Sequence, residues 1–228
     1  MNIRKAALVL LLKDKGAPVL VPAQKNSRRS GVMSKFRMEI FSDALFAIIM
    51  TIMVLELKVP HGVELAALSA VLPVFLSYVL SFIYLGIYWN NHHHLLSVTH
   101  QVSGGILWAN LHLLFWLSLI PFVSGWMGEN RFPPVPTALY GVILLLAGCA
   151  YLLLQREILV REGPDSVLAA AVGKDGKGRV SLLLYALGIA LAFLRPWIAA
   201  VVYVSAALMW LVPDRRIERK VAHALSTP

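Results

Sequence analysis

An aspartate lies inside a stretch of the chain whose centre, residues 44 to 55, is apolar apart from one threonine. Asp43 follows about two helical turns after the start of an apolar run that extends over residues 36 to 59. A charged side chain at the centre of a membrane span costs roughly 2.5 to 3.5 kcal/mol on insertion scales, so an acid inside a span needs a protein partner. One explanation of Asp43 is pairing at the membrane interface with Arg37 or Lys35. The other is a polar network within a helix bundle.

The same run carries a stripe of mostly apolar side chains on a different face. At 100° per residue, Ile48, Ile52 and Leu55 lie within about 60° of one another around the helix axis. Asp43 points about 140° away from Ile48. An intramembrane acid should point to other helices of its own bundle, which leaves the stripe free to meet lipid, another subunit or a pore. The stripe consists of Phe41, Ile48, Thr51, Ile52 and Leu55.

Other residues that bear reactive groups do not form a recognisable catalytic or metal site. His92, His93 and His94 are adjacent, so on a helix they diverge by 100° each, and a shared metal ion would require an unwound segment. Cys149 is the only cysteine, which excludes an intrachain disulfide and a cysteine-based metal site. The spans contain no nucleotide-binding glycine loop, nucleophile elbow or carboxylate pair. We expect no enzyme activity, no cofactor and no fixed metal ion.

The composition is typical of a membrane protein. Of 228 residues, 58% are hydrophobic and 14% are charged, and the mean hydropathy is +0.71. An ordinary soluble domain carries roughly 25% charged residues. The net charge of +9 does not indicate nucleic-acid binding, because the basic residues lie between and outside the apolar runs and form no basic face interleaved with aromatic residues.

The apolar runs predict an all-α fold with six transmembrane helices. Residues 180 to 212 are divided by Arg195 and Pro196 into two pieces of about 24 Å each, shorter than the roughly 30 Å hydrocarbon core, so a single re-entrant element remains the alternative there. We expect a flexible basic extension over residues 1 to 35 and a basic tail over residues 213 to 228. The six-helix domain then covers residues 36 to 212, with spans at 36–59, 65–89, 105–127, 136–154, 180–194 and 197–212.

The positions of lysine and arginine predict the orientation. Eighteen of the 21 lie before or at the start of the first span, in residues 155 to 179, or after residue 212. The other three are Lys58, Arg131 and Arg195. The positive-inside rule then places both termini in the cytoplasm and requires an even number of spans. We expect a multi-pass protein of the cell membrane.

The start of the first span resembles a known family. Arg37-x-x-x-Phe41-Ser42-Asp43, followed by an apolar run to residue 49, is similar to the opening helix of the bacterial and lysosomal potassium-channel family called transmembrane protein 175. The resemblance extends to Trp89-x-x-His92 at the end of the second span and to Asn110 in the third. It covers about 180 residues from Phe36 onward.

The resemblance implies a potassium channel in which the first helices of several subunits line the pore. Ile48 would form the narrowest layer, Ile52 and Leu55 further apolar layers, and Thr51 a hydroxyl ring that contributes to cation selectivity. A single six-helix unit implies a homotetramer, with K⁺ as the permeant ion and lipids as its surroundings. The implied polar network consists of Arg37, Phe41, Ser42, Asp43, Trp89, His92 and Asn110.

The residues by themselves leave alternatives open. The chain has no Thr-Val-Gly-Tyr-Gly carbonyl filter, and the Thr51 hydroxyl could instead bond the carbonyl one turn earlier. A secondary transporter or proton-coupled carrier could use the same helices, although the middle of the first span is aliphatic apart from Thr51. A non-conducting membrane scaffold would use the stripe around Ile48 only for packing.

Overall fold

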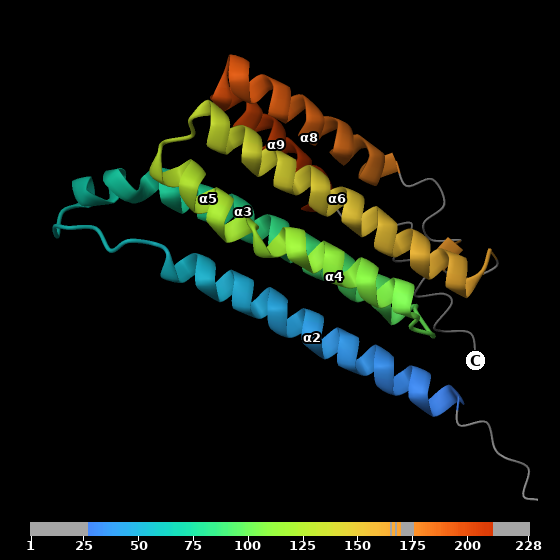
Figure 1. The fold of residues 1–228 in the computed structure, drawn as a ribbon. Helices are drawn as coiled ribbons and strands as arrows, with labels where there is room; N and C mark the ends of the chain where they lie inside the picture. Colours follow the sequence, from blue (N-terminus) through green and yellow to red (C-terminus); the bar gives the residue numbers. More distant parts are fainter. Residues whose placement is uncertain (1–26, 165, 167, 170–175, 212–228) are drawn as a thin grey trace, which may run out of the picture.

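The computed structural model describes residues 27 to 164, 166, 168, 169 and 176 to 211, and these residues form an antiparallel bundle of helices (Figure 1). Most of the predicted N-terminal extension and the whole predicted C-terminal tail lie outside the described residues, so the domain boundaries stay predictions. The helices are α2 (Ser27–Leu55), α3 (Leu65–Ser97), α4 (Gly104–Ser118), α5 (Ile120–Glu129), α6 (Pro134–Glu162), α8 (Gly176–Leu194) and α9 (Pro196–Leu211).

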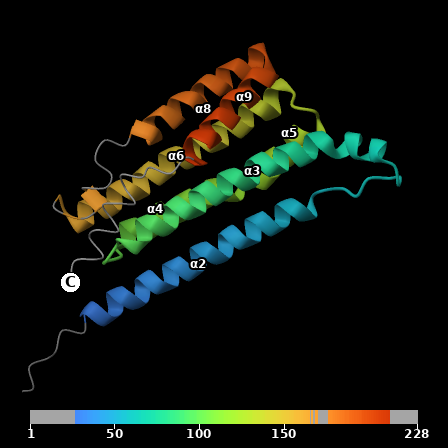
Figure 2. The ribbon, with the colours of Figure 1, turned by 180° about the vertical axis from the view of Figure 1, so that it is seen from behind.

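The structure confirms an all-α fold with helices that can cross a membrane. Five segments have the required length and apolarity, with α4 and α5 together forming one of them, and α9 is a shorter apolar helix of 16 residues. Successive spans alternate in direction, so the start of α2 and the end of α9 lie toward the same end of the bundle (Figures 1 and 2). This arrangement is compatible with the even number of crossings that the charges predict, and whether α9 crosses the membrane stays a prediction.

Proline and glycine set several helix ends. The third span is interrupted at Leu119, between α4 and α5, because Pro121 has no backbone N–H to continue the hydrogen-bond pattern of α4. Gly163 ends α6 with a φ of 89°, a conformation that favours glycine. Pro196 begins α9 directly after Arg195, where the sequence predicted the division. Proline is well tolerated at the first position of a helix because no intrahelical acceptor exists for that amide.

Several boundaries differ from the predictions, among them the end of α6, which continues to Glu162 instead of residue 154. The first helix begins at Ser27, inside the segment expected to be a flexible extension, and it ends at Leu55 instead of residue 59. The second helix continues to Ser97, so the polar residues from Asn90 to His94 are helical and do not follow the helix. Two of the polar side chains in this last part, those of Asn91 and His92, have hydrogen-bond partners within the bundle, which helps the helix to continue.

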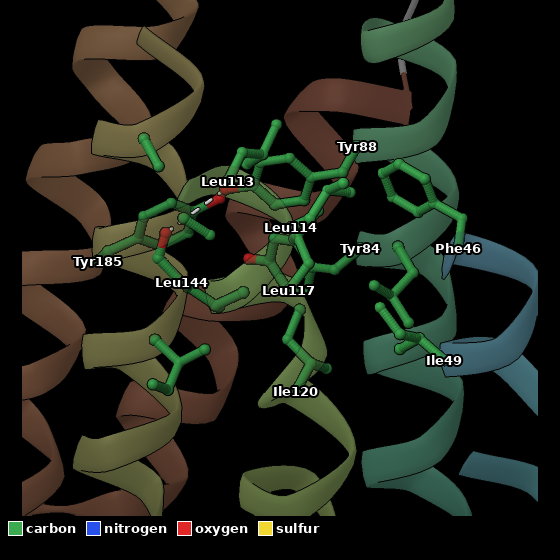
Figure 3. Packing of buried hydrophobic residues seen from close by; sticks show 14 of the residues in the cluster. Phe46, Ile49, Tyr84, Tyr88, Leu113, Leu114, Leu117, Ile120, Leu144 and Tyr185 are labelled. Atoms are coloured by element: carbon green, nitrogen blue, oxygen red, sulfur yellow. Dashed lines mark hydrogen bonds between the residues drawn. The ribbon is translucent and has the colours of Figure 1, made fainter. Parts of the chain in front are cut away.

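Buried tyrosines join the helices at the centre of the bundle. Figure 3 shows Tyr84 and Tyr88 of α3 and Tyr185 of α8 among buried side chains of α4, α5 and α6, with Phe46 and Ile49 of α2 at the other side. The Tyr84 hydroxyl donates to the Tyr203 carbonyl oxygen at 2.7 Å. Each phenol contributes apolar ring surface and a satisfied hydroxyl, which a tyrosine requires inside a membrane bundle.

Replacing Gly141 with alanine should destabilise this packing. A Cβ at Gly141 would collide with the hydroxyl and ring of Tyr203, and Gly188 lies against the same ring, so the ring has little room to move. Overpacking of this kind costs about 1 to 3 kcal/mol, and we expect a lower midpoint of thermal unfolding in detergent. Gly86→Ala is the matched control, because its Cβ would meet nothing within 4 Å. Equal midpoints for the two variants would contradict the tight α6–α8–α9 packing.

Candidate functional site

Helix α2 has one buried face and one exposed face. On the inner face Met53 is only 3% exposed, and the other buried residues, Met38, Ser42, Phe46 and Ile49, recur at helical spacing. On the outer face Ile48 is 54% exposed and Leu55 is 77% exposed, and the rest of the predicted stripe, Phe41, Thr51 and Ile52, is exposed as well. Within the described part of a single copy, no other segment therefore covers the stripe.

The inner face of α2 is joined to α3 and α4 by a chain of hydrogen bonds. Asn110 Nδ2 donates to Ser42 Oγ at 3.0 Å, and Ser42 Oγ donates to the Met38 carbonyl oxygen at 2.8 Å. His92 Nε2 lies 2.8 Å from Asn110 Oδ1. A carboxamide oxygen can only accept, so the His92 proton at this contact belongs to Nε2. Ser42, His92 and Asn110 are all at most 2% exposed, which makes each of these bonds costly to lose.

Asp43 lies at the edge between the two faces of α2. Its Oδ1 accepts a hydrogen bond from Trp89 Nε1 of α3 at 3.0 Å, yet Asp43 itself is exposed. Among the described side chains, neither Lys35 nor Arg37 pairs with Asp43, and Lys35 instead lies 3.8 Å from Glu39. The interfacial pairing that was one explanation of Asp43 is therefore not observed, and its observed partner is an indole N–H.

The structure does not bring every predicted network residue together. Ser42, His92 and Asn110 form one hydrogen-bonded set, and Asp43 with Trp89 forms a second. By contrast, Arg37 and Phe41 are exposed, and Phe41 belongs to the stripe on the outer face of α2. Neither residue makes a hydrogen bond to the network within the described part of the chain. The functional roles of all these residues stay predictions.

The Thr51 hydroxyl makes the intrahelical bond that the sequence left as an alternative. Thr51 Oγ1 donates to the Ala47 carbonyl oxygen at 2.7 Å. This bond uses the only proton of the hydroxyl, but the oxygen keeps lone pairs that point away from that carbonyl. An exposed oxygen of this kind can still accept a hydrogen bond from water or contact a cation.

The three histidines of the run have different surroundings. His92 is committed to Asn110, whereas the His93 ring stacks on Trp89 at a centroid distance of 6.2 Å. Across the described residues, no group of three histidine, cysteine, aspartate or glutamate side chains could hold a metal ion. The His93 and His94 rings contact each other edge to face at a centroid distance of 5.7 Å.

Sequence reasoning missed two contacts at the ends of the bundle. The Glu162 carboxylate accepts from the His100 backbone N–H at 2.7 Å and lies 3.0 Å from His100 Nδ1, which ties the α3–α4 loop to the end of α6. At the other end, Lys58 Nζ and Glu129 Oε1 lie 2.7 Å apart. The two residues of each pair are more than 60 positions apart in the sequence and lie in no local motif. No signal in the sequence could therefore have identified these contacts.

Comparisons with known proteins agree on one family. A family model described as the endosomal/lysosomal potassium channel TMEM175 matches residues 37–121. A potassium channel of Chryseobacterium sp. (strain P1-3) is 51% identical over 189 residues, covering 83% of this chain and 98% of the relative. A potassium channel of Chamaesiphon minutus is 28% identical over 180 residues, covering 72% of this chain and 86% of the relative.

A solved structure has the same fold. The crystal structure of a lysosomal potassium-selective channel TMEM175 homolog from Chamaesiphon minutus matches with a TM-score of 0.70 and 26% sequence identity. The match covers 79% of this chain and 97% of that chain.

Proposed function

The chain belongs to the TMEM175 potassium channel family, and from this premise we propose that four copies form a potassium-permeable channel whose pore is lined by α2. The observation that carries the proposal is the division of α2 into a buried inner face and an exposed outer stripe. By itself an exposed aliphatic stripe would also fit lipid. In a family of channels, the stripe is best explained as the wall of a central pore.

The proposed constriction is a layer of Ile48 side chains, one from each copy. Ile52 and Leu55 follow at one-turn spacing on the same face and would form two further apolar layers. A pore narrowed by branched aliphatic groups offers a cation no ligands, so it controls passage by width and by dewetting. Ions would cross this zone only where the layer is wide enough to hold water.

The proposed selectivity element is a ring of Thr51 hydroxyl groups. The hydroxyl oxygen atoms, and not the protons, would contact the cation. The bond to Ala47 fixes the hydroxyl proton, so the lone pairs are available on the exposed side of α2. We expect Thr51→Ala to lower the preference for potassium over sodium, whereas Thr51→Ser, which keeps the oxygen, should retain it. Reversal potentials under bi-ionic conditions measure this preference. Equal values for Thr51→Ala and the unaltered channel would remove Thr51 from the selectivity element.

Recording from the purified protein tests the proposed function itself. Reconstituted into planar bilayers, the protein should give unitary potassium currents, and light scattering in detergent should give the mass of four copies. A carrier or a scaffold gives no unitary currents, because a carrier moves only a few ions in each conformational cycle. Transport of potassium without unitary events would therefore contradict the channel proposal.

A carrier is the second candidate, and one observation favours it. The third span is discontinuous at Leu119, near its middle, and transporters place their binding sites at such interruptions. However, the Ser118 and Ser124 hydroxyls are already bonded to the Phe115 and Pro121 carbonyl oxygens. The interruption therefore offers few free polar groups to a substrate, and the channel remains the better proposal.

The proposed orientation has both termini in the cytoplasm, and it predicts which residues a membrane-impermeant thiol reagent can reach. In a Cys149→Ala background, a cysteine replacing His61 should react in intact cells. A cysteine replacing Arg161 should react only after permeabilisation, because the positive-inside rule places the end of α6 inside. Western detection of the thiol adduct measures both. The reverse pattern would invert the topology.

A further inference from the structure

His112 lies on the outer face of α4, inside the membrane-crossing part of the chain. The third span extends from Gly104 to Glu129, so His112 is between four and five residues, or roughly 7 Å, from its middle. His112 is exposed, and so are its neighbours Trp108 and Phe115. A polar ring therefore sits on an aromatic surface that no other part of the described chain covers.

One nitrogen of His112 is satisfied and the other is not. Trp116 Nε1 donates to His112 Nε2 at 2.9 Å, so Nε2 acts as an acceptor. A neutral imidazole that accepts at Nε2 carries its proton on Nδ1. No acceptor for this Nδ1–H is found among the described residues. At this depth a lipid tail offers no acceptor, and the headgroups are too far away for an imidazole to reach.

Asn90 on α3 is a second exposed polar side chain without a partner in the described part of the chain, and it lies at the same depth. The contact between His92 and Asn110 sets the register of the antiparallel helices α3 and α4. Two residues back along α3 is Asn90, and two residues forward along α4 is His112. Both therefore lie about 3 Å further into the span than this contact. Asn90 faces away from the bundle.

We infer that His112 Nδ1 of one copy donates to the Asn90 carboxamide oxygen of a neighbouring copy, so that the outer faces of α4 and α3 form the contact between subunits. The inference rests on the proposed tetramer. The helices α3 and α4 both contact α2, through Trp89 and Asn110 respectively. In a ring in which every α2 faces the central axis, the α4 side of one copy meets the α3 side of the next. All copies lie at the same depth, so the Asn90 side chain of one copy is level with the His112 side chain of its neighbour.

Such a contact is heterologous, and crosslinking can test this. Each copy would carry both partners on different surfaces, so a closed ring links every copy to two neighbours. In a Cys149→Ala background, the double variant Asn90→Cys/His112→Cys should give covalent dimers, trimers and tetramers with a short lipid-soluble bis-thiosulfonate reagent. Each single-cysteine variant should remain monomeric on denaturing gels, because its one thiol per copy faces a surface of the neighbouring copy that carries no thiol. A matched control pairs Asn90→Cys with Leu187→Cys on the outer face of α8, and it should not produce the ladder.

The hydrogen bond itself is tested by comparing variants of His112. His112→Phe keeps the ring but lacks the donor, and we expect it to lower the association constant about threefold at each interface, as follows from about 0.6 kcal/mol per interhelical hydrogen bond in a membrane. Because this variant also frees Trp116 Nε1, it is compared in a Trp116→Phe background. His112→Gln can accept from Trp116 and still donate outward, so it should retain the association of the unaltered protein.

The outcomes separate this inference from the proposed function. A tetramer that conducts potassium but gives no ladder with the double cysteine variant would overturn the α3–α4 contact and leave the channel intact. A ladder that stops at dimers would also overturn it, because it would indicate a two-fold symmetric contact. A protein that is monomeric by light scattering would overturn both the contact and the tetrameric channel.

Discussion

Replacement of Ile48 with asparagine is expected to raise the unitary potassium conductance several-fold. The change places four carboxamides where the proposed pore is narrowest, and polar groups hold water where a ring of aliphatic side chains excludes it. The barrier to a hydrated ion at that layer should fall, and each 1.4 kcal/mol removed corresponds to about a tenfold faster passage. Ile48→Val is the matched control, since it keeps an aliphatic surface and should change the conductance much less.

The face of α2 that reaches the pore can be mapped independently. Single cysteines along α2 in a Cys149→Ala background, exposed to a small charged thiol reagent, should block the current with a helical period. The native cysteine has to be removed because it is exposed. Positions 48, 52 and 55 should react, whereas position 53 should not. Reaction at Met50 and Met53 with inert positions 48 and 55 would mean that the pore face is wrong, and no reaction at any position in a conducting channel would place the ion path elsewhere.

The parts of the fold that depend on local signals were predictable from the sequence. The division between α8 and α9 falls at Arg195 and Pro196 because proline cannot continue the hydrogen-bonded pattern of the preceding helix. The alternation of crossing direction follows from the number of apolar runs. The end of α3 was not predictable in the same way. Asn91 Nδ2 donates to the Ile87 carbonyl oxygen and His92 pairs with α4, so residues that look like a polar helix end are satisfied within the helix bundle.

The candidate site was only partly predictable, because contacts between distant residues are not encoded in spacing. The angle of 140° between Asp43 and Ile48 separates two directions on α2, but it does not fix how the helix is rotated against α3 and α4. In the structure Asp43 lies at the edge of the bundle, held by Trp89, and not inside it. The pairing of Ser42 with Asn110 joins residues 68 positions apart, and only the resemblance to a known family pointed to it.

Asn110 is the residue on which the buried network depends most, since its carboxamide bonds both His92 and Ser42. The leucine of an Asn110→Leu variant fills a similar volume, so the variant removes hydrogen bonds without opening a large cavity. His92 then keeps an N–H that is buried and unpaired, while Ser42 still donates to Met38. An unsatisfied buried group costs about 1 to 3 kcal/mol, and we expect a clear fall in the thermal midpoint and in the tetramer fraction in detergent.

The double variant His92→Phe/Asn110→Leu should be more stable than Asn110→Leu alone. Replacing both partners of a buried hydrogen bond with apolar groups removes the unpaired N–H, whereas replacing one of them leaves it in place. Thermal unfolding of the two single variants and the double variant gives the coupling energy between these positions. Asn130→Ala serves as the control, because among the described residues the side chain of this exposed asparagine bonds only the Trp126 carbonyl oxygen of its own helix. If the effects of the two single changes simply add, His92 and Asn110 do not act as a pair. The attachment of α2 to the bundle would then depend on apolar packing through Phe46, Ile49 and Met53.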